Sequence, residues 1–242
     1  LRGDHVKALE LLEKASKVQP EKNAPILVEL GRIHAAAGDM ITEHIVEHYE
    51  AALRIEPDYP DAMLELAMIL SSRSKDPRDQ RRALEFFEKV LMRDPNNGAT
   101  LLAMARHLDF SNGGAPLQIE QLYRRAITAI DGEARLARGR PAIQPWEPRL
   151  SLATYLEFKR EDIQRAGSLY EEACRLAPFE PEVLLALGMF RKVVHEDIDG
   201  AEAVFHKALD ADPLHGGVLV AMGDLLWMCR GEGDAAEVMY KR

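Results

Sequence analysis

The sequence predicts an all-α protein built from about six to seven helix-turn-helix repeats. Ala, Leu, Glu and Arg recur throughout, whereas aromatic residues make up only 6% of the chain. This composition favours helices over strands. One pattern of packing residues also recurs along the whole chain, and proline residues punctuate it. Self-similarity of this kind is the signature of a repeat architecture.

The recurring pattern predicts one helix of each repeat. It begins with Ala or Ile, continues with Leu or an aromatic residue four positions later and a small residue three positions after that, and usually ends at Pro. Spacings of four and three place these residues on one helix face, and Pro ends the helix because it lacks an N–H. The copies are Ala8, Leu12, Ala15 and Pro20; Ile45, Tyr49, Ala52 and Pro57; Ala83, Phe87, Val90 and Pro95; Ile119, Tyr123, Ala126 and Asp131; Ala166, Tyr170, Ala173 and Pro178; Ala201, Phe205, Ala208 and Pro213; and an incomplete copy at Ala236 and Tyr240.

A second apolar stripe between these copies predicts the other helix of each repeat. A small residue recurs in it, at Gly31, Ala67, Ala105, Ala153, Gly188 and Gly223. Such a residue lets two helix backbones approach, and a large neighbouring side chain fills the remaining gap. Each pair of stripes therefore predicts a helical hairpin.

In residue types and offsets, the pattern resembles the tetratricopeptide repeat (TPR), a helix-turn-helix of roughly 34 residues, over essentially the whole chain. Two features depart from it, since Leu, Ile or Met replaces the large aromatic residue of the first helix and most periods are longer. The resemblance implies a right-handed α-solenoid whose first helices line a concave groove. Both ends of the chain fall within a repeat, so we expect a piece of a longer solenoid.

The segment 131–148 is the largest irregularity in what is predicted to be a single superhelix over 1–242. It carries Arg135, Arg138 and Arg140, followed by Pro141, Pro145 and Pro148. We predict an overlong helix to about Arg138 and then a stiff connector. The segment is either a hinge between sub-stacks 1–130 and 149–242 or, as we favour, a surface insertion that leaves the stack unbroken.

Proline and aspartate residues predict where several helices begin. Pro at the first helical position and Asp at the N-cap are both favoured. The predicted helix starts are marked by Pro25, Pro77, Pro116 and Pro181, and the predicted N-caps are Asp61 and Asp76.

Charge and composition disfavour several classes of protein. The formal net charge is −9 and the pI about 5.4, whereas nucleic-acid binders are usually basic. No apolar run reaches the roughly 18 residues that a membrane span needs. Cys174 and Cys229 form no CxxC pair, which argues against a disulfide framework or zinc knuckle. We expect an intracellular, cytoplasmic protein, with the nucleus or a cytoskeletal assembly as alternatives.

The outward positions beside the small residue of each first helix predict the groove. They are Val28, Arg32 and Ala35; Leu64, Met68 and Ser71; Leu102, Arg106 and Asp109; Leu150, Thr154 and Glu157; Leu185, Met189 and Lys192; and Val220, Asp224 and Trp227. Exposed apolar patches mark binding sites, so we predict an apolar floor. The predicted partner-binding residues are Arg32, Met68, Arg106, Met189, Lys192 and Trp227. Alternatively, these long side chains pack on one another, and Trp227 covers a further repeat.

One short segment resembles a catalytic zinc-binding motif. His44, Glu47 and His48 match the H-x-x-E-H pattern of inverted zinc peptidases. However, Ile45, Tyr49 and Ala52 are the packing residues of this helix, which places both histidines on its outer flank. We therefore interpret the match as chance and predict no catalytic residue, no metal and no cofactor.

Two basic clusters are interpreted as solvated faces, or alternatively as docking sites for an acidic partner or RNA. They are Arg73, Lys75, Arg78, Arg81 and Arg82, and the arginines from Arg135 to Arg149.

The leading hypothesis is a non-catalytic scaffold that binds a protein or peptide within a multi-protein complex, with no small-molecule substrate. The first alternative is a scaffold of an RNA-processing complex, because Tyr155, Phe158, Arg165 and Tyr170 resemble the half-a-TPR repeat. The second is the zinc peptidase.

Overall fold

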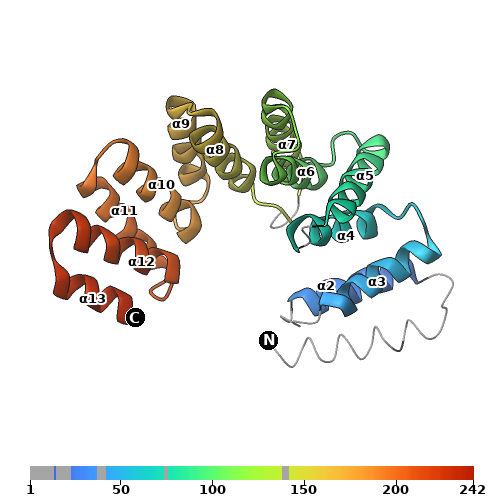
Figure 1. Ribbon diagram of the computed structural model, residues 1–242, viewed down its shortest axis with the longest axis horizontal. Helices are drawn as coiled ribbons and strands as arrows, with labels where there is room; N and C mark the ends of the chain where they lie inside the picture. Colours follow the sequence, from blue (N-terminus) through green and yellow to red (C-terminus); the bar gives the residue numbers. More distant parts are fainter. Residues whose placement is uncertain (1–13, 15–22, 37–41, 74–75, 138–141) are drawn as a thin grey trace. The chain divides into compact units, whose positions relative to one another are not determined.

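The computed structural model describes residues 14, 23–36, 42–73, 76–137 and 142–242. Every regular element in these ranges is helical (Figure 1), which confirms the predicted fold class. The elements are α2 (Ala24–Ala36), α3 (Thr42–Ile55), α4 (Pro60–Arg73), α5 (Pro77–Arg93), α6 (Gly98–Ser111), α7 (Pro116–Leu136), α8 (Trp146–Arg160), α9 (Ile163–Leu176), α10 (Pro181–Val194), α11 (Ile198–Ala211), α12 (Gly216–Leu225), the π-helical turn η2 (Leu226–Arg230) and α13 (Gly233–Lys241).

The chain divides into two compact units, Leu1–Ser111 and Asn112–Arg242. Hairpins form between α2 and α3 and between α4 and α5 in the first unit, and between α8 and α9, α10 and α11, and α12 and α13 in the second. In the second unit, α10 also contacts the first helices on both of its sides, α8 and α12. Within each unit the hairpins therefore stack in chain order, as the repeat pattern predicts.

The small residue of the first helix meets the aromatic residue of the second, as expected from the two stripes. A Cβ atom added at Gly31 would lie only 2.6 Å from Cε1 of Tyr49, and one added at Gly188 would overlap the ring of Phe205. Gly223 and Tyr240 have the same relationship in the last hairpin. Tyr49 and Phe205 are fully buried. In these three hairpins, the aromatic ring of the second helix thus packs directly on the backbone of the first helix at a glycine. The copy at Ala8, Leu12, Ala15 and Pro20 lies outside the described residues.

The long helix before the proline-rich connector is confirmed, because α7 continues to Leu136. Arg149, at the start of α8, ties this region together. Its Nη1 and Nη2 donate to the two carboxylate oxygens of Asp131 on α7 at 2.9 and 2.7 Å, and its Nε donates to Glu172 on α9 at 2.7 Å. Nη1 also donates to the carbonyl of Pro145. The hydrogen bond to Asp131 is the main reason why the pKa of Arg149 is raised.

This arrangement concerns both predictions for 131–148, the hinge and the surface insertion. Helices α7 and α8 belong to the same compact unit, and the unit boundary follows Ser111. The hinge and the surface insertion at 131–148 both stay predictions.

Arg138 and Arg140 of the second basic cluster lie outside the described residues, whereas Arg149 is only 6% exposed. The interpretation of Arg149 as part of a solvated basic face was therefore wrong, since two carboxylates draw it into the packed interior.

Helix starts follow the predicted punctuation with one correction. Pro77, Pro116 and Pro181 each open a helix. Asp76 caps α5 by accepting from the N–H of Arg78 at 2.8 Å, as predicted. Asp61 was predicted as an N-cap, but α4 begins at Pro60. Proline takes the first helical position and leaves Asp61 inside the first turn, where a carboxylate is favoured by the helix dipole instead.

His107 on α6 is a buried titratable group. It is 5% exposed, its ring packs edge-on against Phe87 of α5, and its Nδ1 has no hydrogen-bond partner among the described residues. Burial lowers the pKa of His107 because the charged imidazolium is disfavoured there.

Because of this shift, we expect the free energy of unfolding to fall with acidification. The unfolded chain binds the proton more readily than the folded chain. The stability due to the neutral ring is therefore present above the ordinary histidine pKa of roughly 6.5 and is lost as the pH falls below it, at up to about 1.4 kcal/mol per pH unit. Urea unfolding at several pH values would show a shallower pH dependence for His107→Phe. Identical slopes for both proteins would contradict this assignment.

None of the described helices combines the length and the apolar composition that crossing a bilayer requires.

Candidate functional site

The groove positions of the first unit lie on α2, α4 and α6, and they are less uniformly exposed than predicted. Met68 and Arg106 are exposed. Val28 and Leu102 are buried, so their assignment to an accessible floor was wrong. Both lie three positions before the small residue of their helix, and positions i and i+3 share a helix face. In α2 and α6 the large apolar side chain at this position turns into the core.

Arg32 is surrounded by carboxylates. Its Nε donates to Glu65 on α4 at 2.6 Å, and its Nη atoms donate to Glu29 at 2.8 Å and to Asp61 at 3.3 Å. Burial lowers the pKa of Arg32, but the hydrogen bonds that Arg32 donates to Glu65 and Glu29 outweigh this effect, and the pKa is raised. One cation with three anions makes this patch negative overall. Arg32 is therefore a bridge between two first helices, and the patch does not present the isolated cation that the sequence suggested.

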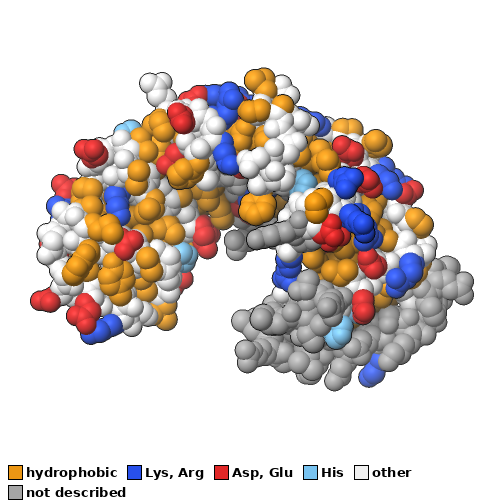
Figure 2. Space-filling model, viewed as in Figure 1, with side chains coloured by type: hydrophobic (Ala, Val, Ile, Leu, Met, Phe, Trp, Pro, Cys, Tyr) orange, Lys and Arg blue, Asp and Glu red, His pale blue; other side chains and the backbone are white. Residues whose placement is uncertain are grey.

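The groove positions of the second unit lie on α8, α10, α12 and η2, and several of them expose large apolar side chains. Trp227 is 61% exposed, and Met189 and Val220 are also exposed. Lys192 is half-buried on α10. Figure 2 shows hydrophobic side chains gathered over α12, in the lower left of the view. At the groove positions, α10 and the α12–η2 segment therefore carry solvent-facing apolar groups.

Two carboxylates at groove positions are held by tyrosines of the second helices. Tyr170 on α9 donates to Oε2 of Glu157 on α8 at 2.7 Å, and Tyr240 on α13 donates to Oδ1 of Asp224 on α12 at 2.8 Å. Burial, followed by the bond to Glu157, raises the pKa of the Tyr170 phenol. The sequence analysis gave these tyrosines no role at the groove. The signal was the choice of Tyr where other repeats have Phe.

A further row of apolar side chains escaped the sequence analysis. Phe158 lies near the end of α8, Val193 lies near the end of α10, and Met228 lies in η2; all three are more than half exposed. Each follows the last predicted groove position of its helix by one residue. The row recurs at equal intervals in the sequence, so the repeat alignment could have found it. It extends the apolar surface toward the C-terminal ends of the first helices.

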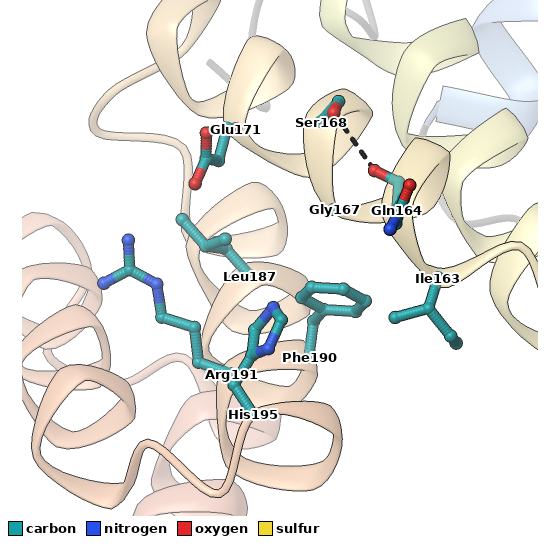
Figure 3. A pocket seen from close by; sticks show the side chains of 9 residues that line it. All are labelled: Ile163, Gln164, Gly167, Ser168, Glu171, Leu187, Phe190, Arg191 and His195. Carbon is teal, nitrogen blue, oxygen red and sulfur yellow. Dashed lines mark hydrogen bonds between the residues drawn. The ribbon is translucent and has the colours of Figure 1, made fainter.

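A small pocket of about 290 Å³ lies between α9 and α10 (Figure 3). Phe190 forms part of its wall and packs against Gly167, whose missing side chain leaves room for the ring. His195 packs edge-on against Phe190 at 5.1 Å between centroids. Figure 3 also shows the hydroxyl of Ser168 directed at the carbonyl of Gln164, to which it donates at 3.0 Å. The pocket lining thus combines acidic, basic and uncharged polar side chains.

The histidines of the zinc-like string do not gather around a common centre with other ligands. The His48 ring stacks on His34 of α2 at 5.3 Å between centroids, and His44 is exposed on α3. In the described part of the chain, no group of three or more His, Cys, Asp or Glu side chains is placed to hold a metal ion.

One arginine of the first basic cluster has an acidic partner. Arg82 pairs with Glu50 of α3 at 3.0 Å and also lies over the ring of Phe86. Arg81 donates to the carbonyl of Pro77 in its own helix. Lys75 lies outside the described residues.

Comparison with known proteins places this arrangement among known folds. No protein-family model matches the chain. Over 107 residues, 39% of this chain and 61% of the relative, it is 27% identical to photosystem I assembly protein Ycf3 of Rippkaea orientalis strain PCC 8801 / RF-1. The matched region thus spans less than two thirds of the length of that relative.

Solved structures resemble the chain over nearly its whole length. A tetratricopeptide repeat protein from Parabacteroides merdae matches with a TM-score of 0.66 and 16% identity, over 99% of this chain and 86% of that one. PilW, a widely conserved type IV pilus biogenesis factor, matches with a TM-score of 0.70 and 16% identity, over 91% and 92% of the two chains. The chain therefore has the tetratricopeptide-repeat fold, as the residue pattern predicts.

Proposed function

We propose that the chain is a protein-interaction scaffold that holds a segment of a partner protein against its first helices, as part of a larger assembly. The observation that carries the proposal is the set of exposed apolar side chains on α8, α10, α12 and η2, which includes Phe158, Met189 and Trp227. Solvent-facing apolar groups at corresponding positions of neighbouring helices cost free energy unless a partner covers them.

The comparisons support the assembly role by analogy. Ycf3 is named as an assembly protein and PilW as a biogenesis factor, and both names describe proteins that help build multi-protein structures. The fold alone does not define a function, so the exposed residues of this chain carry the argument. The proposed contact residues are Arg106, Met68, Met189, Lys192 and Trp227, with Arg32 as part of the negative patch beside them.

Replacing both groove methionines by aspartate should remove partner binding. We expect Met68→Asp combined with Met189→Asp to reduce recovery of specific partners at least about tenfold. The reason is that removing a buried apolar side chain from the interface, or desolvating a carboxylate there, costs roughly 1 to 3 kcal/mol at each position. Quantitative affinity purification of the tagged chain measures this effect.

The matched control is Met92→Asp. Met92 is 80% exposed on α5, a second helix, and is not a groove position. Partners that are absent with the double variant and retained by the control support the groove. Equal recovery from all three proteins, each confirmed as helical by circular dichroism, would exclude these first-helix surfaces as the binding site.

A further inference from the structure

A second pocket, of about 370 Å³, lies between α7, α8 and α9 in the second unit. Leu152 and Leu156 of α8 form its apolar floor, flanked by Ile127 of α7 and Leu169 of α9. Pockets for cofactors and drug-sized ligands span roughly 300 to 1,000 Å³, and this one is at the small end. Its size and apolar floor suit one large side chain of a partner better than a cofactor.

The floor of this pocket faces away from the groove. Leu152 and Leu156 are four residues apart on α8 and share one face, whereas the groove position Thr154 lies between them in sequence and is exposed on another face. Leu152 and Leu156 are almost completely buried. The pocket and the groove are therefore separate surfaces of the same helix.

The charged residues that line the pocket are both arginines, Arg124 of α7 and Arg165 of α9. They converge on one oxygen of Glu120, to which Nη2 of Arg124 donates at 3.0 Å and Nη1 of Arg165 at 2.6 Å. Asp162 accepts from Nε of Arg165 at 2.5 Å. Neither carboxylate is part of the pocket lining. The pocket lining thus contains two guanidinium groups and no acidic side chain, and each guanidinium is paired with a carboxylate just outside the lining.

These ion pairs hold the arginines in place and leave them able to bind. Burial raises the pKa of Glu120, but the hydrogen bonds from Arg165 and Arg124 outweigh it, so its pKa is lowered and it stays charged. Arg124 uses Nε and Nη2 on Glu120, and Arg165 uses Nε and Nη1 on its two partners. Since a guanidinium has five N–H donors, each arginine retains donors for a further acceptor, and carboxylates accept such bonds most strongly.

We propose that this pocket docks an apolar side chain of an acidic segment of a partner protein, with flanking Asp or Glu residues accepting from Arg124 and Arg165. The site is additional to the groove and does not depend on it. A basic segment would place like charges beside the arginines, and an uncharged segment would leave their remaining donors to water.

The proposal can be tested with fluorescent probe peptides and the full chain. The acidic probe has ten residues, with a central Leu-Phe pair between Asp and Glu residues. One comparison probe carries Lys at the acidic positions, and another carries Ala in place of the Leu-Phe pair. We expect fluorescence anisotropy to show binding of the acidic probe at least about tenfold tighter than of either comparison probe. Equal binding of the acidic and Lys probes, or no binding of any probe, would overturn the proposal.

A matched pair of threonine variants tests whether the acidic probe binds in the pocket or in the groove. Thr128 lines the pocket, and Thr154 lies on the groove side of α8. Both are exposed, and each donates its hydroxyl to the carbonyl four residues earlier, at 3.1 and 3.0 Å. Thr128→Trp should fill the pocket and weaken binding of the acidic probe at least about tenfold, whereas Thr154→Trp should leave it unchanged. The opposite result would assign the probe to the groove and end the proposal.

The charge requirement is tested by Arg124→Gln, which leaves Arg165 on Glu120. This variant should weaken the acidic probe about fivefold and should not weaken a probe with Asn and Gln at the acidic positions. Equal loss for both probes would contradict the role of Arg124. Failure of the groove methionine variants to affect partner recovery would bear on the proposed function alone, because those residues do not line this pocket.

Discussion

Replacing Phe205 with alanine is expected to lower the free energy of unfolding of the second unit by about 4 kcal/mol, since truncating a buried Phe costs roughly 3 to 5 kcal/mol. Phe205 of α11 is 0% exposed. It fits over Gly188 of α10, where even one added carbon would overlap its ring. The same core contains Leu184, Val218 and Leu219, so the ring joins two successive hairpins. Urea unfolding followed by circular dichroism measures the loss.

The control for this prediction is Phe158→Ala. Phe158 is the same residue type on a first helix of the same unit but is 69% exposed, so its truncation should change stability by less than about 0.5 kcal/mol. Similar losses for both variants would show that Phe205 does not close its hairpin. The double variant Gly188→Ala, Phe205→Leu should lose less stability than Phe205→Ala, because the added methyl group occupies some of the space that the ring vacates.

Replacing Arg149 with methionine should cost about 3 kcal/mol, at the lower end of the range for breaking a buried ion pair. The side chain of Arg149 is 8% exposed, whereas those of Asp131 and Glu172 are 25% and 39% exposed. Water can therefore reach the two carboxylates partly once their partner is gone, and it limits the penalty. Thermal and urea unfolding provide the measurement.

Two further variants separate the ion cluster from simple loss of an arginine. Arg135→Met removes an exposed arginine of the neighbouring helix α7 and should be nearly neutral. Adding Asp131→Asn and Glu172→Gln to Arg149→Met should restore part of the stability, because the uncompensated charges disappear. If the triple variant is no more stable than Arg149→Met alone, the cluster is not the source of the effect.

The repeat architecture could be predicted from the sequence because it rests on local spacing. The pairing of Gly31 with Tyr49 and of Gly188 with Phe205 follows from two stripes with fixed offsets. The end of α7 followed from the last periodic residue before a proline-rich stretch. The spacing within each stripe depends on neighbours within one or two helical turns, which periodicity describes well.

The candidate sites were less predictable because they depend on packing between hairpins. The helical position of Val28 gave no means of distinguishing a groove-facing side chain from a buried one. Arg32 was expected to be available to a partner, but Glu65, 33 residues later, binds it. Arg149 was expected at the surface, and two carboxylates from other helices bury it. The pocket between α7, α8 and α9 combines residues from three helices, and no short motif marks it.

The ring-on-glycine joints have a mechanical consequence. Within the second unit, the extensive helix–helix packing links elements that are adjacent or next but one in the chain, so a pulling force along the array passes through each joint in turn. Such a chain should yield one hairpin after another, with the remaining hairpins still folded, and should rewind when the tension is released.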